Sequence, residues 1–412
     1  MNNFNILLEK YANLVVTKGV NLQKDTLLFI NSPIECNEFA RLLSEEAFKL
    51  GAKDVYINYS DELFTKLRFE EVATETLENV PQYEIDKYNY FVDNGASFIS
   101  ISASNPSLFK DIDSKKIAAA SKAKSLALRN YSDKLMNNEN AWCVISMPTK
   151  AWAMKVFSDC TSENAVSKLW DAIFSVMRID GSNNPSLEWD RHLENLKVNM
   201  KELQRNNFKK LIFKNNLGTN LHIELPKGHI WCGGADYTKD GKLFIANMPT
   251  EEIFTTPKRN GINGTVISTK PLNHSGNLIN NFKLTFKDGK VIDFTAEEGY
   301  DSLKELLNTD DGSRYLGEVA LVPYDSPISN SNILFYNTLF DENASCHLAL
   351  GKAYPSCIEN GENMSDEELL DANSNISLIH VDFMIGSKDL NITGVTYDSK
   401  EIPVFKDGNF CL

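Results

Sequence analysis

Paired cysteine motifs are absent from this sequence, although it contains seven cysteines. No CxxC pair occurs, so the sequence supports neither a zinc ribbon nor a thioredoxin-like redox motif. The number of cysteines is odd and their spacing is wide, which is typical of free thiols in a reducing cytosol. The positions are Cys36, Cys143, Cys160, Cys232, Cys346, Cys357 and Cys411.

Long hydrophobic runs are also absent. No apolar stretch approaches the ~18 residues that a membrane-spanning helix needs. The first residues, MNNFNILLEKYANLVV, lack the basic region followed by an apolar region that marks a signal peptide. We therefore expect a cytoplasmic protein without a membrane partner.

Basic residues are fewer than acidic ones. The chain of 412 residues has 42 Lys and Arg against 56 Asp and Glu, so its formal net charge is −14. Because a nucleic-acid or anionic-membrane surface needs clusters of Lys and Arg, we expect no nucleic acid partner. The acidic balance is compatible with cationic ligands, namely metal ions or substrates with a free amino group, although solubility alone also explains it.

Several sequence motifs of other enzyme classes are missing. Neither GxGxxG nor GxxxxGK[ST] follows a predicted strand, which argues against a dinucleotide or ATP site. The absence of GxSxG argues against a serine hydrolase. Cys346 adjoins His347, but neighbours on a helix point apart and cannot pair as nucleophile and base. We expect Cys346 to be packed in the interior.

The first half of the chain alternates short apolar runs with helical patterns. Predicted strands lie at 26–30, 55–59, 98–101 and 142–146. Predicted helices include 35–50 and 114–128. Gly51 suits the position after the first helix, because glycine tolerates a positive φ. Strands separated by helices predict a parallel sheet with helices on its faces, and we expect this half to be a scaffold.

The pattern changes near residue 208. A polar, mostly helical connector is predicted over about 160–208. Hairpins are predicted after it at 211–225 and 282–295, the second around Asp288-Gly289, a dipeptide that suits a tight turn. The sequence therefore predicts an α/β domain with a parallel sheet over 1–208, connector included, and a β-rich α+β catalytic domain over 209–412.

Histidine is scarce, and two of the six histidines lie near carboxylates. His380 and Asp382 belong to the run IHVDFMIG, which predicts a strand. Residues two apart in a strand point to the same face, so the two side chains project together. Such a pair can ligate zinc, cobalt or manganese. The alternative is a hydrogen-bonded His–Asp pair at a strand edge.

The segment DENASCHLALG contains Glu342 and His347, five residues apart. We expect a helix over about 344–351, with both side chains around its N-terminal end. In the alternative, Asp341 or Asn343 caps this helix and His347 is only a surface residue. Capping does not exclude ligation of a metal.

Two further candidate positions hold glutamates in apolar surroundings. Glu318 heads EVALVP, which predicts a buried strand, and a buried carboxylate is costly unless it is paired or metal-bound. Arg314 is the alternative partner. In NMPTEEIFTTP we expect one of Glu251 and Glu252 to be exposed and the other to turn inward. Together the segments supply carboxylates and imidazoles of the right kind and number for two divalent ions that share a bridging carboxylate.

In these segments the chain resembles the thermophilic-type metallo-aminopeptidases, the family of aminopeptidase T, aminopeptidase S and PepS. The resemblance covers essentially the whole chain. It is most specific in NMPTEEIFTTP, RYLGEVALVP, DENASCHLALGKAYP and IHVDFMIGS, whose order and spacing match the family. It implies two divalent metal ions, zinc, cobalt or magnesium. The ligands that it implies are Glu252, Glu318, Glu342, His347, His380 and Asp382.

The resemblance also implies a reaction and partners. A metal-dependent aminopeptidase would release N-terminal amino acids from small peptides by attack of a hydroxide that bridges the two ions. Glu318 is the candidate bridging ligand or proton carrier. Tyr354 matches a tyrosine close to the metals, where it either donates to the developing oxyanion or packs beside a ligand. Family members form homodimers with an enclosed cavity, so we expect a homodimer that acts on small peptides with a free N-terminus.

Two other functions remain open from the sequence. The metal site could hold a peptide or an amino acid without catalysis. It could also serve another dinuclear metallohydrolase, such as a phosphoesterase. A phosphoesterase would need a basic clamp near the metals, for which only Arg314 is an obvious candidate. The preferred N-terminal residue and the physiological metal do not follow from the sequence.

Overall fold

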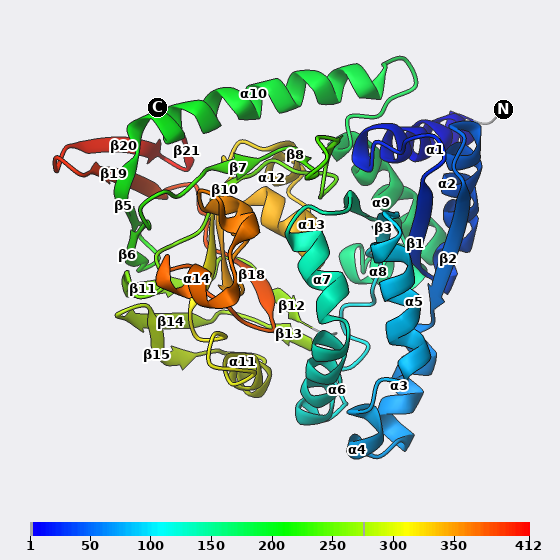
Figure 1. Cartoon of the computed structure of the whole chain (residues 1–412), viewed down its shortest axis with the longest axis horizontal. Helices are drawn as coiled ribbons and strands as arrows, with labels where there is room; N and C mark the ends of the chain where they lie inside the picture. The colour runs from blue at the N-terminus through cyan, green and yellow to red at the C-terminus, as the bar shows by residue number, and fades with distance from the viewer. Residues whose placement is uncertain (1–2, 275–276) are drawn as a thin grey trace.

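The computed structural model describes residues 3–274 and 277–412, and its N-terminal half is built on a parallel sheet (Figure 1). The strands of this sheet are β1 (Leu27–Pro33), β2 (Asp54–Ser60), β3 (Ser97–Ile101) and β4 (Trp142–Ile145). They lie in the order β2-β1-β3-β4, and every neighbouring pair is parallel. The predicted α/β architecture is therefore confirmed.

Helices bury both faces of this sheet. The helices of the N-terminal half are α1 (Asn3–Leu14), α2 (Asn37–Lys49), α3 (Glu62–Glu71), α4 (Thr74–Leu77), α5 (Gln82–Asp93), α6 (Ser114–Ala127), α7 (Arg129–Met136), α8 (Lys150–Val156), α9 (Ser162–Val176) and α10 (Pro185–Asn206). Leu28 and Ile30 of β1 belong to one hydrophobic core, whereas Phe29 between them belongs to another. Gly51 follows the end of α2 with φ +84°, as its position after the helix predicts.

The helical connector consists of α9 and α10, and α10 runs along the top of Figure 1 toward β5 (Phe208–Lys214). Asn184 accepts a hydrogen bond from the amide of Ser186 and so caps α10, and Pro185 opens the helix at a position where it costs no hydrogen bond. The core of the N-terminal half also contains Met248 and Phe340. Because side chains from both halves share this core, the domain division near residue 208 stays a prediction.

The C-terminal half is built on antiparallel sheets. The strands are β5, β6 (Asn220–Glu224), β7 (Cys232–Gly233), β8 (Asp236–Tyr237), β9 (Leu243–Phe244), β10 (Ile253–Thr255), β11 (Ile262–Ile267), β12 (Leu272–His274), β13 (Asn277–Ile279), β14 (Lys283–Lys287), β15 (Lys290–Thr295), β16 (Leu316–Leu321), β17 (His347–Gly351), β18 (His380–Met384), β19 (Asn391–Thr396), β20 (Glu401–Lys406) and β21 (Asn409–Phe410). Eight of them form a sheet in the order β15-β14-β11-β6-β5-β19-β20-β21. A five-stranded sheet has the order β18-β17-β16-β10-β7. The predicted hairpins are present as β5–β6 and β14–β15.

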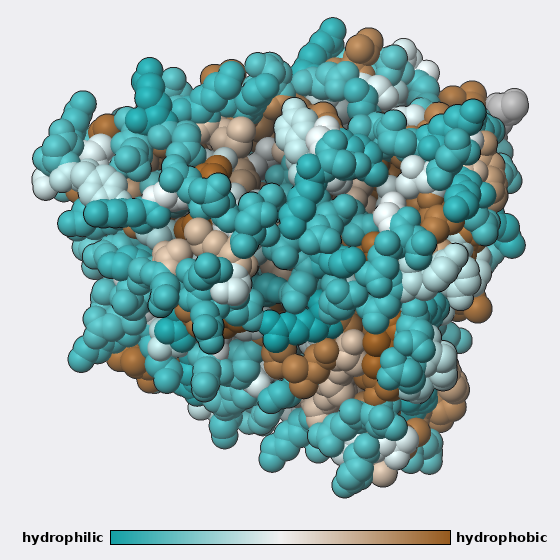
Figure 2. Space-filling view, viewed as in Figure 1, coloured by the Kyte–Doolittle hydropathy of each residue, from teal (hydrophilic) through white to brown (hydrophobic). Residues whose placement is uncertain are grey.

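Short helices lie between these strands. They are α11 (Tyr300–Leu307), α12 (Pro327–Asn330), α13 (Thr338–Asp341), the 3-10 turns η3 (Glu342–Ala344), η4 (Pro355–Cys357) and η5 (Gly361–Asn363), and α14 (Asp366–Asp371). Within the described residues, no helix combines the length and apolar character that crossing a bilayer requires. The face seen in Figure 2 is mostly hydrophilic, in keeping with the acidic composition.

The prediction of a helix over 344–351 is wrong, because the strand β17 begins at His347. This strand lies between β16 and β18 and pairs antiparallel with both. The leucines and alanines of HLALG favour a helix when they are considered alone. Their alternation, however, suits a strand, and the hydrogen bonds of two neighbouring strands override local propensity. The change of element matters for the site, since a strand sends His347 and Ala349 to the same face.

Candidate metal centre

One face of the five-stranded sheet carries most of the candidate ligands. The register pairs Glu318 with Ala349 and Ala349 with Asp382, so these side chains share a face. His347 lies two residues before Ala349, and His380 lies two residues before Asp382, so both histidines also project from it. The intervening residues of these strands face the hydrophobic core instead. Alternation along three strands therefore gathers four polar side chains.

Glu252 reaches the same face from the start of β10. Phe254 pairs with Ala320 of β16, and Glu252 lies two residues before it. The chain just before Glu252 is tied to the edge strand of the N-terminal sheet. The amide of Val144 donates to the carbonyl of residue 246 over 2.7 Å, and the amide of Met248 donates to the carbonyl of Val144 over 3.0 Å. The N-terminal sheet thus helps to position a candidate ligand of the C-terminal half.

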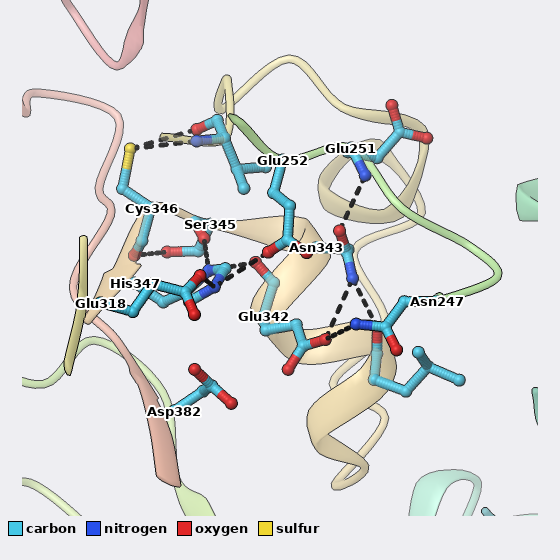
Figure 3. Close-up of polar contacts among 12 residues, drawn as sticks. Asn247, Glu251, Glu252, Glu318, Glu342, Asn343, Ser345, Cys346, His347 and Asp382 are labelled. Atoms are coloured by element: carbon cyan, nitrogen blue, oxygen red, sulfur yellow. Dashed lines mark hydrogen bonds and ion pairs between the residues drawn. The ribbon is translucent and has the colours of Figure 1, made fainter. Parts of the chain in front are cut away.

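Glu318 lies between the two histidines. Its Oε1 is 3.7 Å from Nε2 of His347, and its Oε2 is 3.2 Å from Nε2 of His380. Nε2 of His347 is also 3.0 Å from Oε2 of Glu252, and Nε2 of His380 is 3.4 Å from Oδ1 of Asp382. Each histidine thus completes a set of three side chains whose ligand atoms lie within 4.8 Å of one another, and Glu318 belongs to both sets. Figure 3 shows Glu252, Glu318, His347 and Asp382 converging.

Backbone carbonyls orient both histidine rings. Nδ1 of His347 donates to the carbonyl of Glu342 over 3.0 Å, and Nδ1 of His380 donates to the carbonyl of Lys352 over 2.6 Å. This arrangement turns Nε2 of each ring toward the carboxylates and is typical of histidines that ligate metals. Burial alone would lower the pKa of each histidine, but the neighbouring carboxylates outweigh it and raise both pKa values well above the ordinary value. The site therefore favours a positive charge next to each Nε2.

The residues present fit divalent cations. Oδ1 of Asp382 is buried and accepts no hydrogen bond from the described residues, so a lone pair is available for a ligand. Burial raises the pKa of Glu252, which shows that its charge is poorly solvated. Carboxylate oxygens and imidazole nitrogens are the donors that zinc and similar ions prefer. Divalent cations would neutralise this acidic cluster.

Glu342 lies beside these side chains but belongs to neither set of three. Its Oε1 accepts from Nδ2 of Asn343 over 3.3 Å and from Nδ2 of Asn247 over 3.5 Å, which leaves its other oxygen directed into the site (Figure 3). Burial, followed by repulsion from Asp382 and Glu252, raises the pKa of Glu342 well above its ordinary value. Its surroundings thus differ from those of the other carboxylates.

The expectation that one of Glu251 and Glu252 is exposed is wrong, because both are buried. Glu251 forms an ion pair with Arg178 over 2.5 Å, and its other oxygen lies 3.6 Å from Nε2 of His192. Its amide donates to Oδ1 of Asn343 over 2.7 Å. Glu251 therefore anchors the segment that carries Glu252, a role that the sequence analysis missed.

Two further expectations concern Arg314 and Tyr354. Arg314 does not pair with Glu318, and instead donates to Oδ1 of Asn308 over 2.7 Å and to the carbonyl of Val291 over 3.3 Å.

The ring of Tyr354 meets that of His380 edge-on, with centroids 4.9 Å apart. Burial, followed by the charge of Glu318, raises the pKa of the Tyr354 hydroxyl, which therefore keeps its proton. Within the described residues, this hydroxyl makes no hydrogen bond, so it is free to donate one.

The candidate ligands open into a cavity of about 300 Å³ between the two halves. Its walls include Tyr354, Phe254 and the paired glycines Gly233 and Gly234. Ser102, Asn138, Trp142 and Val144 of the N-terminal half also line it. The N-terminal half is thus more than a scaffold, and it forms part of the site. No sequence motif marks these residues, since they meet the centre only through the packing of the two halves.

Comparisons with known proteins show what this chain is similar to. The family model of the thermophilic metalloproteases (M29) matches residues 4–410. Aminopeptidase 2 of Geobacillus stearothermophilus is 50% identical over 410 residues, with 100% of this chain and 99% of that protein covered. Aminopeptidase AmpS of Bacillus subtilis (strain 168) is 47% identical, with 100% of both chains covered.

A solved structure supports the same assignment. Wild-type AmpT from Thermus thermophilus superimposes with a TM-score of 0.90 at 34% identity, and the match covers 99% of this chain and 100% of that one. The agreement extends over both halves of the chain. The full-length family match and these relatives together show that the chain belongs to the thermophilic metalloprotease (M29) family.

Proposed function

We propose that this protein releases N-terminal amino acids from small peptides by means of two divalent metal ions. Membership of the M29 family and relatives named aminopeptidases make it a metal-dependent aminopeptidase. The observation that carries the finer proposal is the division of the Glu318 oxygens between His347 and His380. A carboxylate shared by two ligand sets suits a centre in which two ions lie close together.

The two sets of three define which residues would hold each ion. Glu252, Glu318 and His347 would hold one, and Glu318, His380 and Asp382 would hold the other. Bound zinc, cobalt or magnesium ions supply the Lewis acidity that activates a water and polarises a peptide carbonyl. The carbonyls that accept from Nδ1 keep each imidazole in the tautomer whose Nε2 can bind a cation.

Glu342 and Tyr354 would handle protons and charge during the reaction. We assign Glu342 as the proton carrier rather than as a ligand, because it belongs to neither set of three and one of its oxygens is directed into the site. Its free oxygen would take the proton of the attacking water and return it to the leaving amine. The hydroxyl of Tyr354 would donate to the carbonyl oxygen as negative charge develops there.

The cavity supports a small substrate with a free amino group. A volume of about 300 Å³ lies at the small end of the range for ligand pockets. The described residues that line it include no Lys or Arg. This acidic lining favours an ammonium group and disfavours the phosphoesterase alternative, which needs a basic clamp. The assembled candidate ligand set likewise argues against a role in binding alone.

Hydrolysis of leucine p-nitroanilide by the purified protein tests the proposal. Treatment with a chelator should abolish release of p-nitroaniline, and added zinc or cobalt should restore it. Elemental analysis should find about two ions per chain. N-acetyl-leucine p-nitroanilide is the matched control and should not be cleaved, because its amino group is blocked. Activity that persists after complete removal of metal would contradict the proposal.

The homodimer and the cytoplasmic location inferred from the sequence stay predictions. If two copies enclose the cavity, the dimer would limit access to short peptides. Sedimentation of the purified protein across a range of concentrations would measure the assembly. A molecule that sediments as a monomer while keeping full peptidase activity would contradict the dimer, without affecting the proposed metal centre.

A further inference from the structure

One carboxylate in the cavity wall is outside the proposed catalytic machinery. Asp236 lies on β8, which Figure 1 shows between the two halves of the molecule. Neighbouring residues of a strand point in opposite directions, and Tyr237 is 62% exposed to solvent. Asp236 accordingly faces the interior, where it lines the same cavity as the candidate ligands.

The hairpin that carries Asp236 is fixed against the N-terminal half. The amide of Lys239 donates to the carbonyl of Asn138 over 2.9 Å, and the amide of Ile245 donates to the carbonyl of Gly19 over 2.7 Å. The paired glycines just before β8 place no side chain in the neighbouring part of the cavity. Asp236 is therefore held in place beside open space rather than on a loose loop.

The carboxylate of Asp236 has no partner among the described residues, because none of them donates a hydrogen bond to it or forms an ion pair with it. Burial, followed by the charges of Glu362 and Glu252, raises its pKa to about 6, so the group is mostly ionised at neutral pH. Asp236 is half-buried, and a partly desolvated, ionised carboxylate without a partner is costly. A cationic ligand in the cavity would remove this cost.

The charge of the cavity leads to the same conclusion. Its described lining contains five carboxylates, those of Asp236 and of Glu252, Glu318, Glu342 and Asp382, and no Lys or Arg. Two divalent ions would contribute +4 against −5, which leaves −1. Asp236 belongs to neither ligand set, so bound ions would not be coordinated by its carboxylate.

An aromatic surface lies next to Asp236. The register pairs Asp236 with Phe244, and the rings of Phe244 and Trp142 lie 6.4 Å apart between centroids. Trp142 also lines the cavity, and its Nε1 is already engaged with the carbonyl of Leu135 over 3.2 Å. Trp142 is only half-buried, so part of its ring stays open to a planar cation. Guanidinium groups bind both to carboxylates and to tryptophan faces.

We propose that Asp236 is a specificity-determining residue that pairs with the cationic side chain of an N-terminal arginine or lysine in the substrate. The proposal rests on the aminopeptidase function above and adds the side-chain class that the enzyme prefers. The α-amino group of the substrate is adjacent to the scissile bond, so it must stay near the ligand sets. Asp236 lies outside both ligand sets, so we assign it to the substrate side chain. Arginine is favoured over lysine, because Trp142 can stack on a guanidinium.

The test compares L-arginine with L-citrulline, which has the same shape but no charge. Calorimetric titration of the zinc-loaded full-length protein should show that arginine binds about tenfold or more tightly than citrulline. In Asp236→Asn, which changes charge but not size, this ratio should fall toward one. Asp240→Asn removes a carboxylate from the exposed turn of the same hairpin, and it should keep the wild-type ratio.

A second measurement uses turnover of arginine and leucine p-nitroanilides. The ratio of their kcat/KM values should fall by about tenfold in Asp236→Asn and should recover in Asp236→Glu. An unchanged ratio, or an equal fall for both substrates, would overturn the proposal. If neither substrate were hydrolysed, the aminopeptidase assignment would fail instead, and the arginine-to-citrulline binding ratio would still decide the role of Asp236.

Discussion

The amide of Glu251 donates a hydrogen bond of 2.7 Å to Oδ1 of Asn343, and so joins two segments that are 92 residues apart. Nδ2 of the same asparagine donates to Oε1 of Glu342 over 3.3 Å and to the carbonyl of Leu339 over 2.9 Å. One side chain thus sets the position of the segment before Glu252 and that of the Glu342 carboxylate. In the proposed mechanism these are a ligand and the proton carrier.

We predict that Asn343→Ala lowers kcat by roughly 100-fold, because small displacements of catalytic groups have large effects on rate. The lost hydrogen bonds should also lower the free energy of unfolding by roughly 1–3 kcal/mol. Steady-state kinetics and chemical denaturation measure the two effects. Asn363→Ala, at an exposed position, is the control and should change neither. Wild-type kcat in a folded Asn343→Ala protein would contradict the positioning role.

Glu318→Gln tests the shared ligand. The amide keeps the size of the carboxylate but loses the charge, so both ligand sets are weakened at once. We expect the metal content to fall from about two ions per chain to one or fewer, and activity to fall by more than roughly 100-fold. Elemental analysis and p-nitroanilide hydrolysis provide the measurements. Glu367→Gln removes an exposed carboxylate and should retain both metals. Two bound ions in Glu318→Gln would argue against a bridging role.

Tyr354→Phe separates the hydroxyl from the packing of the ring. The phenylalanine keeps the contact with His380, so metal content should stay at the wild-type level. If the hydroxyl donates to the developing oxyanion, kcat should fall by roughly 100-fold while KM changes little. Tyr397→Phe changes a half-exposed tyrosine elsewhere and serves as the control. A Tyr354→Phe enzyme with wild-type kcat would show that the tyrosine only packs beside the histidine.

Removal of metal should destabilise the whole protein. Without ions, the buried carboxylates of Glu252, Glu342 and Asp382 repel one another, whereas ions bind only the folded arrangement. At about 100 times the dissociation constant, such binding adds roughly 2.7 kcal/mol, so chelation should lower Tm by roughly 3 °C or more. Differential scanning calorimetry measures the shift. Glu318→Gln should show a smaller shift with the same chelator. An unchanged wild-type Tm would mean that no strong metal site exists.

The local sequence predicted the elements whose side-chain pattern matches their burial. The apolar runs around Phe29 and Ile99 predicted a parallel sheet, because helical patterns separate the predicted strands along the chain. Alternation in HVDFM correctly put His380 and Asp382 on one face of a strand. His347 was assigned to a helix instead, because Leu and Ala have high helix propensity and the strands on either side of it are remote in sequence.

Short-range patterns in the sequence, together with its resemblance to a known family, determined which residues could ligate a metal and which half of the chain would hold them. Only the tertiary structure decided that Glu251 is buried against Arg178, that Asn343 joins two segments, and that Asp236 faces the cavity. The physical reason is that these arrangements depend on partners tens of residues away. A side chain's own sequence neighbours limit its direction within a strand or helix, but the packing of other elements decides what it meets there.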